Sequence, residues 1–254
     1  MNKTIERLAP YVFGLIALGA WQGLVWALNV PSYVLPGPIA IVQAYIDAHA
    51  ILNQALLSTL SVTFAALLAA TAIGVALAVA MAASRLFRAA VQPWAVILQV
   101  TPIVAIAPFI IIWVNQPFLA LVVCAIIVAF FPILSNTAAG LASTPADLQD
   151  LFRLNGATRW QTLTLLSLPA ALPSFLTGLR ISGTLALVGA VVAEFVAGSG
   201  GFASGLAYRI IEASYRLEIP RMFAALVLLG LSGIVIYAAL GWLEAALLRR
   251  RDGA

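Results

Sequence analysis

The sequence predicts an all-α membrane protein with six transmembrane helices in a single domain, residues 1–254. Hydrophobic residues make up 63% of the chain and charged residues 9%, far below the roughly 25% of a typical soluble domain. Six apolar runs are each long enough to supply the ~20 helical residues that cross a bilayer core. They cover residues 9–30, 56–83, 91–114, 117–139, 172–197 and 222–248.

Charged residues set the expected orientation of these spans. None occurs from Ala89 to Ala146, a stretch too long for one span, and Asn115–Gln116–Pro117 is the polar turn signal near its middle. Most basic residues fall on one side of the six spans, and basic loops stay in the cytoplasm. These residues are Lys3, Arg7, Arg85, Arg88, Arg153, Arg159 and Arg249 to Arg251. We therefore expect a multi-pass chain with both termini in the cytoplasm.

The first two spans and the segment between them differ in character. The first apolar run is longer than the hydrophobic region of a signal peptide, which predicts a retained anchor. Residues 30–50 hold three prolines and then a short amphipathic stretch, typical of an external re-entrant segment or surface helix. The second run is rich in alanine and contains Thr59 and Gly74, so it is expected to pack inside the bundle.

Prolines interrupt the next two spans. Pro102 and Pro108 lie in the third span and Pro132 lies in the fourth. Each proline removes a helix hydrogen bond, which hydrocarbon tolerates only where protein or water satisfies the freed carbonyl. Broken helices near the bilayer midplane often line a transport path, so these prolines are candidate path residues. A packing kink is the alternative at each position.

The fifth span carries two charged residues, Arg180 and Glu194. On a straight helix they fall about 40° apart on one face and ~21 Å apart along the axis. A charge embedded in a membrane indicates a functional site because its exposure to lipid costs several kcal/mol. Both residues are candidate path residues, with snorkelling toward the two interfaces as the alternative.

A glycine-rich and then amphipathic segment follows the fifth span. It ends in a stretch with three arginines and two glutamates on the side opposite the termini. This stretch is a candidate docking surface for an external partner, and a solvated connecting helix is the alternative. The docking residues are Arg209, Glu212, Arg216 and Glu218.

The polar stretch from 143 to 170 predicts two short helices between the fourth and fifth spans. Thr144 with Asp147 is a capping-box pattern that predicts the start of the first helix. Asn155–Gly156 predicts its end, because glycine takes the left-handed conformation easily. Thr158 with Gln161 repeats the capping box, and Leu168–Pro169 is expected to end the second helix.

This stretch resembles the EAA motif of ABC importer permeases, which reads Glu-Ala-Ala, three residues, Gly, and an apolar run closed by Leu-Pro. Gly156 and Leu168–Pro169 match the motif, whereas Asp150, Leu151 and Phe152 stand at the Glu-Ala-Ala positions. The resemblance continues through Gly178–Phe195 and Tyr33–Ile41. It covers almost the whole chain and points to the permeases of the sulfonate, nitrate, taurine and pyrimidine or riboflavin uptake group.

The resemblance implies the fold of a type I ABC importer permease, with cytoplasmic coupling helices that sit on an ATPase. An amphipathic loop lying on the inner membrane surface is the alternative. The implied ATPase-coupling residues are Asp147, Asp150, Leu151, Phe152, Gly156, Ala157, Thr158, Arg159 and Trp160.

The resemblance also implies the rest of an importer in the cell inner membrane. Its partners would be two ATPase subunits, which hold ATP and Mg, a periplasmic or lipid-anchored binding protein, and a second permease chain in a homodimer. This chain itself needs no cofactor, touches membrane lipid, and has no feature of a nucleic-acid-binding protein. A small organic solute would pass by alternating access, and both a sulfonate-type anion and a nitrogen heterocycle stay open.

Several activities are excluded or disfavoured by missing residues. Lys3 is the sole lysine, so the chain has no phosphate-binding GxxxxGK[ST] loop and is not a P-loop ATPase. His49 is the sole histidine, which disfavours a metal centre or a His-dependent catalytic site. An ion- or proton-coupled secondary transporter is the main rival, although the chain lacks a detectable duplicated half and several intramembrane acids.

Overall fold

The computed structural model describes residues 3–198 and 204–252, and every regular element in this part of the chain is a helix. The elements are α1 (Lys3–Ala27), α2 (Pro38–Ala83), α3 (Arg85–Val100), α4 (Ile103–Trp113), α5 (Pro117–Ala142), α6 (Ala146–Leu154), α7 (Arg159–Thr162), the π-helical turn η1 (Leu163–Ser167), α8 (Leu168–Ala197), α9 (Leu206–Tyr215) and α10 (Ile219–Asp252). The all-α prediction is confirmed.

Five helices in the described ranges are long and apolar enough to cross a membrane, namely α1, α2, α5, α10 and the continuous helical stretch that ends in α8. The predicted third span is instead a pair of helices, α3 and α4, bent by 101° at Thr101–Pro102. Thr101 is extended there, because a residue before proline is pushed out of the helical region. The six predicted spans are therefore five or six, depending on whether this bent pair counts as one.

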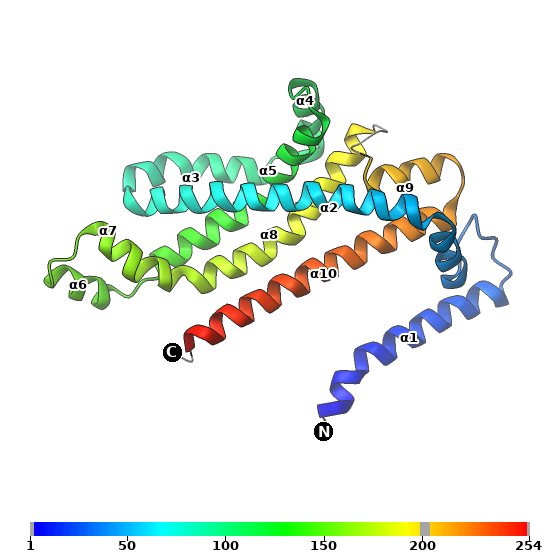
Figure 1. Cartoon of the computed structure of the whole chain (residues 1–254), viewed down its shortest axis with the longest axis horizontal. Coiled ribbons are helices and arrows are strands. Elements are labelled where there is room, and N and C mark those ends of the chain that lie inside the picture. Colours follow the sequence, from blue (N-terminus) through cyan, green and yellow to red (C-terminus); the bar gives the residue numbers. More distant parts are fainter. Residues whose placement is uncertain (1–2, 199–203, 253–254) are drawn as a thin grey trace.

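The segment predicted at residues 30–50 is not separate from the second span, because residues 38–50 belong to α2. Its helix starts at Pro38, the third of the three prolines, and continues unbroken for 46 residues to Ala83. A straight helix of that length measures about 69 Å, more than twice the ~30 Å of the hydrocarbon core. Figure 1 shows that its first turns do not continue the line of the remainder. The amphipathic stretch is thus joined to the second span by continuous helix, while its first turns leave the line of that span.

The core of the bundle lies where α5 packs against α8 and α2, and α10 covers α8 on its other side (Figure 1). Small residues bring α5 and α8 into close contact. A Cβ atom added to Gly178 would lie 2.8 Å from the carbonyl oxygen of Pro132. The Ser182 hydroxyl donates across the same interface to the carbonyl oxygen of Ala129, at 2.6 Å. Such small-residue contacts are how membrane helices approach closely without a hydrophobic driving force.

Helix α1 stands apart from the rest of the bundle (Figure 1). Only 6% of the residues in its most apolar window are buried, and Tyr11 and Phe13 are 72% and 75% exposed. Near its end, α1 is linked to α2 by the hydrogen bond from the Ile39 N–H to Gln22 Oε1, at 3.1 Å. The described chain alone therefore leaves most of the surface of α1 uncovered by protein.

Candidate functional site

The candidate site residues divide between the two ends of the bundle. Figure 1 shows α6 and α7 at one end and α9 at the opposite end. We call these the loop end (residues 143–170) and the α9 end (residues 204–221). The predicted coupling residues lie at the loop end, and the predicted docking residues lie at the α9 end.

The start of α6 differs from the prediction. Its N-cap residue is Pro145, and no side chain caps the helix. The Thr144 hydroxyl instead donates to the carbonyl oxygen of Leu141 (3.1 Å), which extends the end of α5. The predicted capping box of Thr144 and Asp147 is therefore wrong, because Pro145 takes the cap position one residue later. Asp147 still lies in the first turn, where a negative charge favours the helix dipole.

The end of α6 matches the prediction. Gly156 has a φ of +74°, and its N–H donates to the carbonyl oxygen of Arg153 at 3.0 Å. The next N–H, of Ala157, donates back to the carbonyl oxygen of Phe152 at 3.0 Å. This pair of bonds is a Schellman motif, which satisfies the last carbonyls of a helix. The turn therefore depends on the residue at 156 tolerating a positive φ.

The second predicted capping box is also present. The Gln161 N–H donates to Thr158 Oγ1 (3.2 Å), and the Thr158 N–H donates to Gln161 Oε1 (2.8 Å). The helix does not end at Leu168–Pro169, however. It passes through the π turn η1 into α8, where Pro169 occupies the first turn and needs no N–H partner. The loop end is therefore joined rigidly to the span that follows it.

The loop end exposes large apolar side chains among its charges. Leu151, Leu154 and Trp160 are 53%, 84% and 69% exposed. Asp150 pairs with Arg153 at 2.9 Å in an exposed ion pair. None of the residues in α6, α7 or η1 is buried. The local structure of this loop is thus held by the Schellman turn and the second capping box, and its large apolar side chains stay exposed within residues 3–198 and 204–252.

Arg180 lies on α8, facing α10. Its guanidinium Nη1 is 3.4 Å from Glu244 Oε2, and its Cζ lies 3.9 Å from the centre of the Tyr237 ring. The Thr177 hydroxyl donates to the other oxygen of Glu244, at 3.1 Å. A cation–π contact and an ion pair together stabilise the guanidinium inside the bundle. The positive charge of Arg180 is therefore balanced within the chain by α10.

Glu194 sits near the end of α8 and is only 2% exposed. Its Oε2 accepts a hydrogen bond from the Ala207 N–H (3.1 Å), in the first turn of α9. The neighbouring Leu206 N–H donates to Thr59 Oγ1 of α2, at 2.9 Å. Gly205 lies against the Glu194 carboxyl group, where any Cβ atom would clash. The first N–H groups of a helix have no acceptor within the helix and need one from elsewhere. Two spans supply these acceptors for the first turn of α9.

The predicted docking residues form one ion network. Glu212 pairs with Arg209 at 2.7 Å, with Arg216 at 2.9 Å and with Arg221 at 3.9 Å. Arg221 also pairs with Glu218 at 2.8 Å. The hydrogen bond from Arg209, with the charges of the three arginines, holds the pKa of Glu212 below its usual range. The network fixes α9 to the start of α10.

The three candidate path prolines have different environments. Pro102 caps α4 at the sharp bend, and Pro108 lies inside α4. Pro132 lies inside α5, which stays helical from Pro117 to Ala142, so the predicted break is absent there. Asn136 Nδ2 donates to the carbonyl oxygen of Pro132 (2.8 Å), which supplies a polar contact inside the helix.

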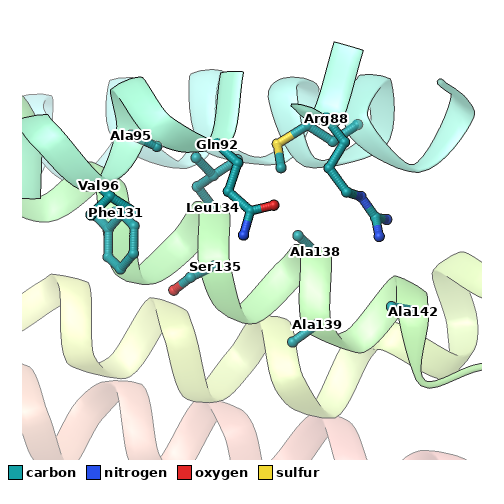
Figure 2. A pocket seen from close by; sticks show the side chains of 11 residues that line it. Arg88, Gln92, Ala95, Val96, Phe131, Leu134, Ser135, Ala138, Ala139 and Ala142 are labelled. Atoms are coloured by element: carbon teal, nitrogen blue, oxygen red, sulfur yellow. The ribbon is translucent and has the colours of Figure 1, made fainter. Parts of the chain in front are cut away.

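A pocket opens near the loop end, between α3 and α5 (Figure 2). Its volume is about 280 Å³. The lining residues are Met81, Arg88, Gln92, Ala95, Val96, Phe131, Leu134, Ser135, Ala138, Ala139 and Ala142. None of these residues was predicted as a site residue, since they become neighbours only when α3 folds back along α5.

The fold is that of ABC importer permeases. A crystal structure of an amino acid ABC transporter matches 80% of this chain and 97% of its own, with a TM-score of 0.66 and 18% identity. An inward-facing MetNI methionine ABC transporter matches 79% of this chain and 97% of its own, with a TM-score of 0.63 and 22% identity. At these identities the likeness shows the fold alone.

The sequence identifies the family. Residues 70–251 match the family described as binding-protein-dependent transport system inner membrane component, and the chain belongs to that family. It is 34% identical over 249 residues to the formylaminopyrimidine transport permease protein ThiX of Halalkalibacterium halodurans, covering 98% of both. It is 36% identical over 254 residues to the riboflavin transport system permease protein RibX of Chloroflexus aurantiacus, covering 97% of this chain and 93% of that one. A putative aliphatic sulfonates transport permease, SsuC of Bacillus subtilis, is 28% identical and covers 93% of this chain and 85% of its own.

This protein is therefore the permease subunit of a binding-protein-dependent ABC importer for small solutes, a multi-pass chain of the inner membrane. It is not itself an ATPase. Membership implies an ATPase and a binding protein as partners. The family also selects the ATP-driven importer over the ion-coupled carrier that the composition left open.

Proposed function

We propose that the loop end is cytoplasmic and is the surface on which the ATPase subunits sit. The observation that carries this proposal is the exposure of Leu151, Leu154 and Trp160 on a loop in which the end of α6 and the start of α7 are already capped. Apolar side chains exposed together, surrounded by charges, are typical of a protein-binding surface. The arginines of this end, such as Arg153 and Arg159, agree with a cytoplasmic position.

Cross-linking tests this placement. Cys124 is buried and is the only cysteine of the chain, so it is replaced first by alanine. A single cysteine is then introduced by Leu154→Cys, at an 84% exposed position, or by Tyr215→Cys, at an 85% exposed position of the α9 end. The Leu154→Cys variant is expected to cross-link to the ATPase in the assembled complex, and the Tyr215→Cys variant is not. Equal cross-linking of both variants would reject the assignment.

The α9 end is then the docking surface for the external binding protein. Arg209, Glu212, Arg216 and Glu218 form its charged surface, and Tyr215 stands exposed beside them. Charges at the rim of an interface mainly control the association rate and its salt dependence. We expect Arg216→Glu to slow docking, because Arg216 is 59% exposed, and to weaken the salt dependence of docking. Unchanged docking kinetics would count against this surface.

A second permease chain completes the pathway in this proposal. The exposed surface of α1 and its separation from the bundle support a partner that covers it within the membrane. Two identical chains would carry two ATPase subunits, which bind the ATP and Mg. The measurement is the mass of the detergent-solubilised complex, and a single permease chain per complex would reject the homodimer.

The proposed solute is a small nitrogen heterocycle. ThiX and RibX, named for a pyrimidine and for riboflavin, are 34% and 36% identical to this chain, against 28% for SsuC. Glu244 and Tyr237 also pair with the Arg180 guanidinium. This cation therefore has no unpaired positive charge to offer an anionic solute. Arg180, Glu194 and the prolines Pro102, Pro108 and Pro132 remain proposed path residues. A sulfonate-type anion is the second candidate, supported by the likeness to SsuC.

The ligand of the cognate binding protein decides between the two solutes. The binding protein that stimulates ATP hydrolysis by the reconstituted complex is purified with its bound ligand, which is identified by mass spectrometry. We expect a nitrogen heterocycle, and uptake of the same compound into vesicles that contain ATP. A sulfonated ligand would overturn the proposed solute while leaving the permease assignment intact.

A further inference from the structure

The pocket between α3 and α5 extends to the ends of three helices. Met81 is two residues from the end of α2, Arg88 lies in the first turn of α3, and Ala142 is the last residue of α5. All three helix ends point toward the loop end. If that end is cytoplasmic, as proposed above, the pocket lies at the depth of the cytoplasmic leaflet of the membrane.

Two of the three polar side chains of this pocket, those of Arg88 and Gln92, have no partner in the described part of the chain. Arg88 and Gln92 lie one turn apart on α3, and Figure 2 shows both side chains reaching from α3 toward α5. Neither takes part in a hydrogen bond or ion pair within residues 8–198 and 204–249, where side chains are described. Ser135 lies on the opposite wall, with only a 3.4 Å contact from its hydroxyl to the carbonyl oxygen of Pro132. The pocket thus offers a free cation and two neutral hydrogen-bonding groups.

The remainder of the pocket is apolar and comes from α2, α3 and α5. Arg88, Gln92, Val96 and Val100 are spaced four residues apart, so they form one stripe that winds about 40° around the helix at each step. Val100 continues the stripe beyond the pocket. The stripe changes from charged to polar to apolar over ~18 Å, which is about the depth of one leaflet. Val96 and Val100 are 44% and 71% exposed, and Phe131 faces the stripe from α5. A ligand that fits must be anionic at one end and apolar along its length.

We propose that this pocket binds an anionic phospholipid of the cytoplasmic leaflet. The Arg88 guanidinium holds the phosphate, the Gln92 amide and the Ser135 hydroxyl donate to the headgroup oxygens, and an acyl chain lies along Val96 and Val100. Basic pockets between membrane helices on the cytoplasmic side are suited to acidic headgroups. The volume of about 280 Å³ accommodates a headgroup and not a whole lipid, which agrees with the stripe continuing beyond the pocket. A small soluble anion would leave that apolar stripe unused.

The test measures lipid binding by the full-length chain, purified in detergent and titrated with phosphatidylglycerol, by native mass spectrometry. Arg88→Gln is expected to weaken binding of phosphatidylglycerol about fivefold, the loss of one basic contact at a membrane surface. Arg85→Gln is the matched control, because it removes the same charge three residues earlier at a position outside the pocket. It is expected to change binding little. Val96→Trp keeps every charge and is expected to weaken binding by filling the partly exposed apolar part of the pocket.

Three results would overturn the proposal. Equal losses in the Arg85→Gln and Arg88→Gln variants would indicate general surface attraction, and equal binding of phosphatidylcholine would remove the need for a net negative charge. Displacement of phosphatidylglycerol by millimolar inorganic phosphate would indicate a site for free anions. If Arg88→Gln does not fold, the Val96→Trp variant alone decides, since unchanged binding there excludes the pocket. The assay contains neither ATPase nor solute, so its failure is separate from a failure of the proposed ATPase contact.

Discussion

The loop end and the α9 end both carry short helices rich in charged residues, but different contacts hold these helices in place. At the loop end, α6 and α7 are stabilised by the Schellman turn at Gly156 and by the capping box of Thr158 and Gln161, all within the loop. At the α9 end, the caps come from Glu194 of α8 and from Thr59 of α2, which is 147 residues from its partner Leu206. The first end is specified locally and the second by the assembled bundle.

This difference predicts how each end responds to change. A helix capped by its own loop keeps its shape when the spans move, because every bond moves with it. A helix capped by two spans keeps its first turn only while those spans keep their relative position. Movement of α2 against α8 should therefore reach α9 directly, whereas the loop end should move as a rigid piece joined to α8 through η1.

The largest expected effect comes from removing a buried cap of α9. Thr59→Val keeps the shape of a fully buried side chain and leaves the Leu206 N–H without an acceptor. An unsatisfied buried donor costs about 1–3 kcal/mol, so α9 should detach from the bundle more often. Trypsin cleavage at Arg209 and Arg216 in reconstituted vesicles measures this detachment, and cleavage should become several-fold faster.

Thr71→Val is the matched control for this change. Within the described residues, the Thr71 hydroxyl bonds only to the carbonyl oxygen of Leu67, one turn earlier in α2, and the position is partly buried. Its loss leaves no donor unsatisfied, so cleavage at α9 should stay at the wild-type rate. Equal cleavage of the Thr59→Val and Thr71→Val variants would show that α9 is held by its own ion network instead of by the spans.

A smaller effect is expected from Glu212→Gln. Glu212 pairs with three arginines, of which Arg209 and Arg221 are 21% and 15% exposed. Since these groups are only partly buried, we expect the loss to be about 1–2 kcal/mol, below the 3–5 kcal/mol of a fully buried pair. Proteolysis of α9 should accelerate less than in the Thr59→Val variant.

The pH dependence of this network follows from the lowered pKa of Glu212. A carboxyl group with a depressed pKa in the folded state contributes stability that is complete above its unfolded pKa, about 4.3 for glutamate, and is lost as the pH falls through the folded value. The wild-type α9 should therefore resist proteolysis down to about pH 4.3 and loosen in more acidic solution. In the Glu212→Gln variant, the proteolysis of α9 is expected not to change across this pH range. If proteolysis rises with acid as steeply as in the wild type, Glu212 is not the cause.

Prediction from sequence succeeded where the structure is local. The end of α6 at Asn155–Gly156 and the capping box at Thr158 depend on residues within five positions of each other, so a short stretch of sequence contains the whole cause. The start of α6 was wrong by one residue because Pro145 and Thr144 compete for the same cap position. The helical spans were predictable because each satisfies its own backbone in hydrocarbon.

Prediction failed where a partner lies far away in the chain. Glu244 and Tyr237, which hold Arg180, are 64 and 57 positions from it and were not singled out. Glu194 was expected to share a helix face with Arg180, and in the structure their partners lie on different helices, α9 and α10. A charged residue in a membrane helix indicates that a partner exists, but only the packing of the bundle shows which residue that partner is.

At the loop end, changes at Gly156 should affect coupling more than stability. Nothing lies within 4 Å of a Cβ atom added there, so the cost is conformational, ~1–2 kcal/mol at its φ of +74°. Gly156→Val, with a β-branched side chain, should distort the Schellman turn and reduce both ATPase pull-down and solute-stimulated ATP hydrolysis, while the melting of the spans stays unchanged. Gly156→Asn is the control, because asparagine tolerates the left-handed region. Full coupling in the valine variant would mean that this turn is not part of the ATPase contact.

The smallest effect on stability is expected at Asp150, and this makes it the sharpest probe of the proposed contact. Asp150 pairs with Arg153 three residues on, and the two side chains are 58% and 79% exposed. Such a pair contributes at most ~0.5 kcal/mol, so Asp150→Ala should leave the helix content and melting of the chain unchanged. Any loss of ATP hydrolysis or uptake must then come from a surface that Asp150 touches outside the chain.

Asp150→Arg reverses the charge without burying it and should weaken ATPase association further. The effect should be strongest at low salt, because exposed charges are screened within about 10 Å at 0.1 M salt. Wild-type pull-down and uptake in both variants, at low and high salt, would remove Asp150 from the ATPase contact and leave the exposed apolar side chains of α6 and α7 as its basis.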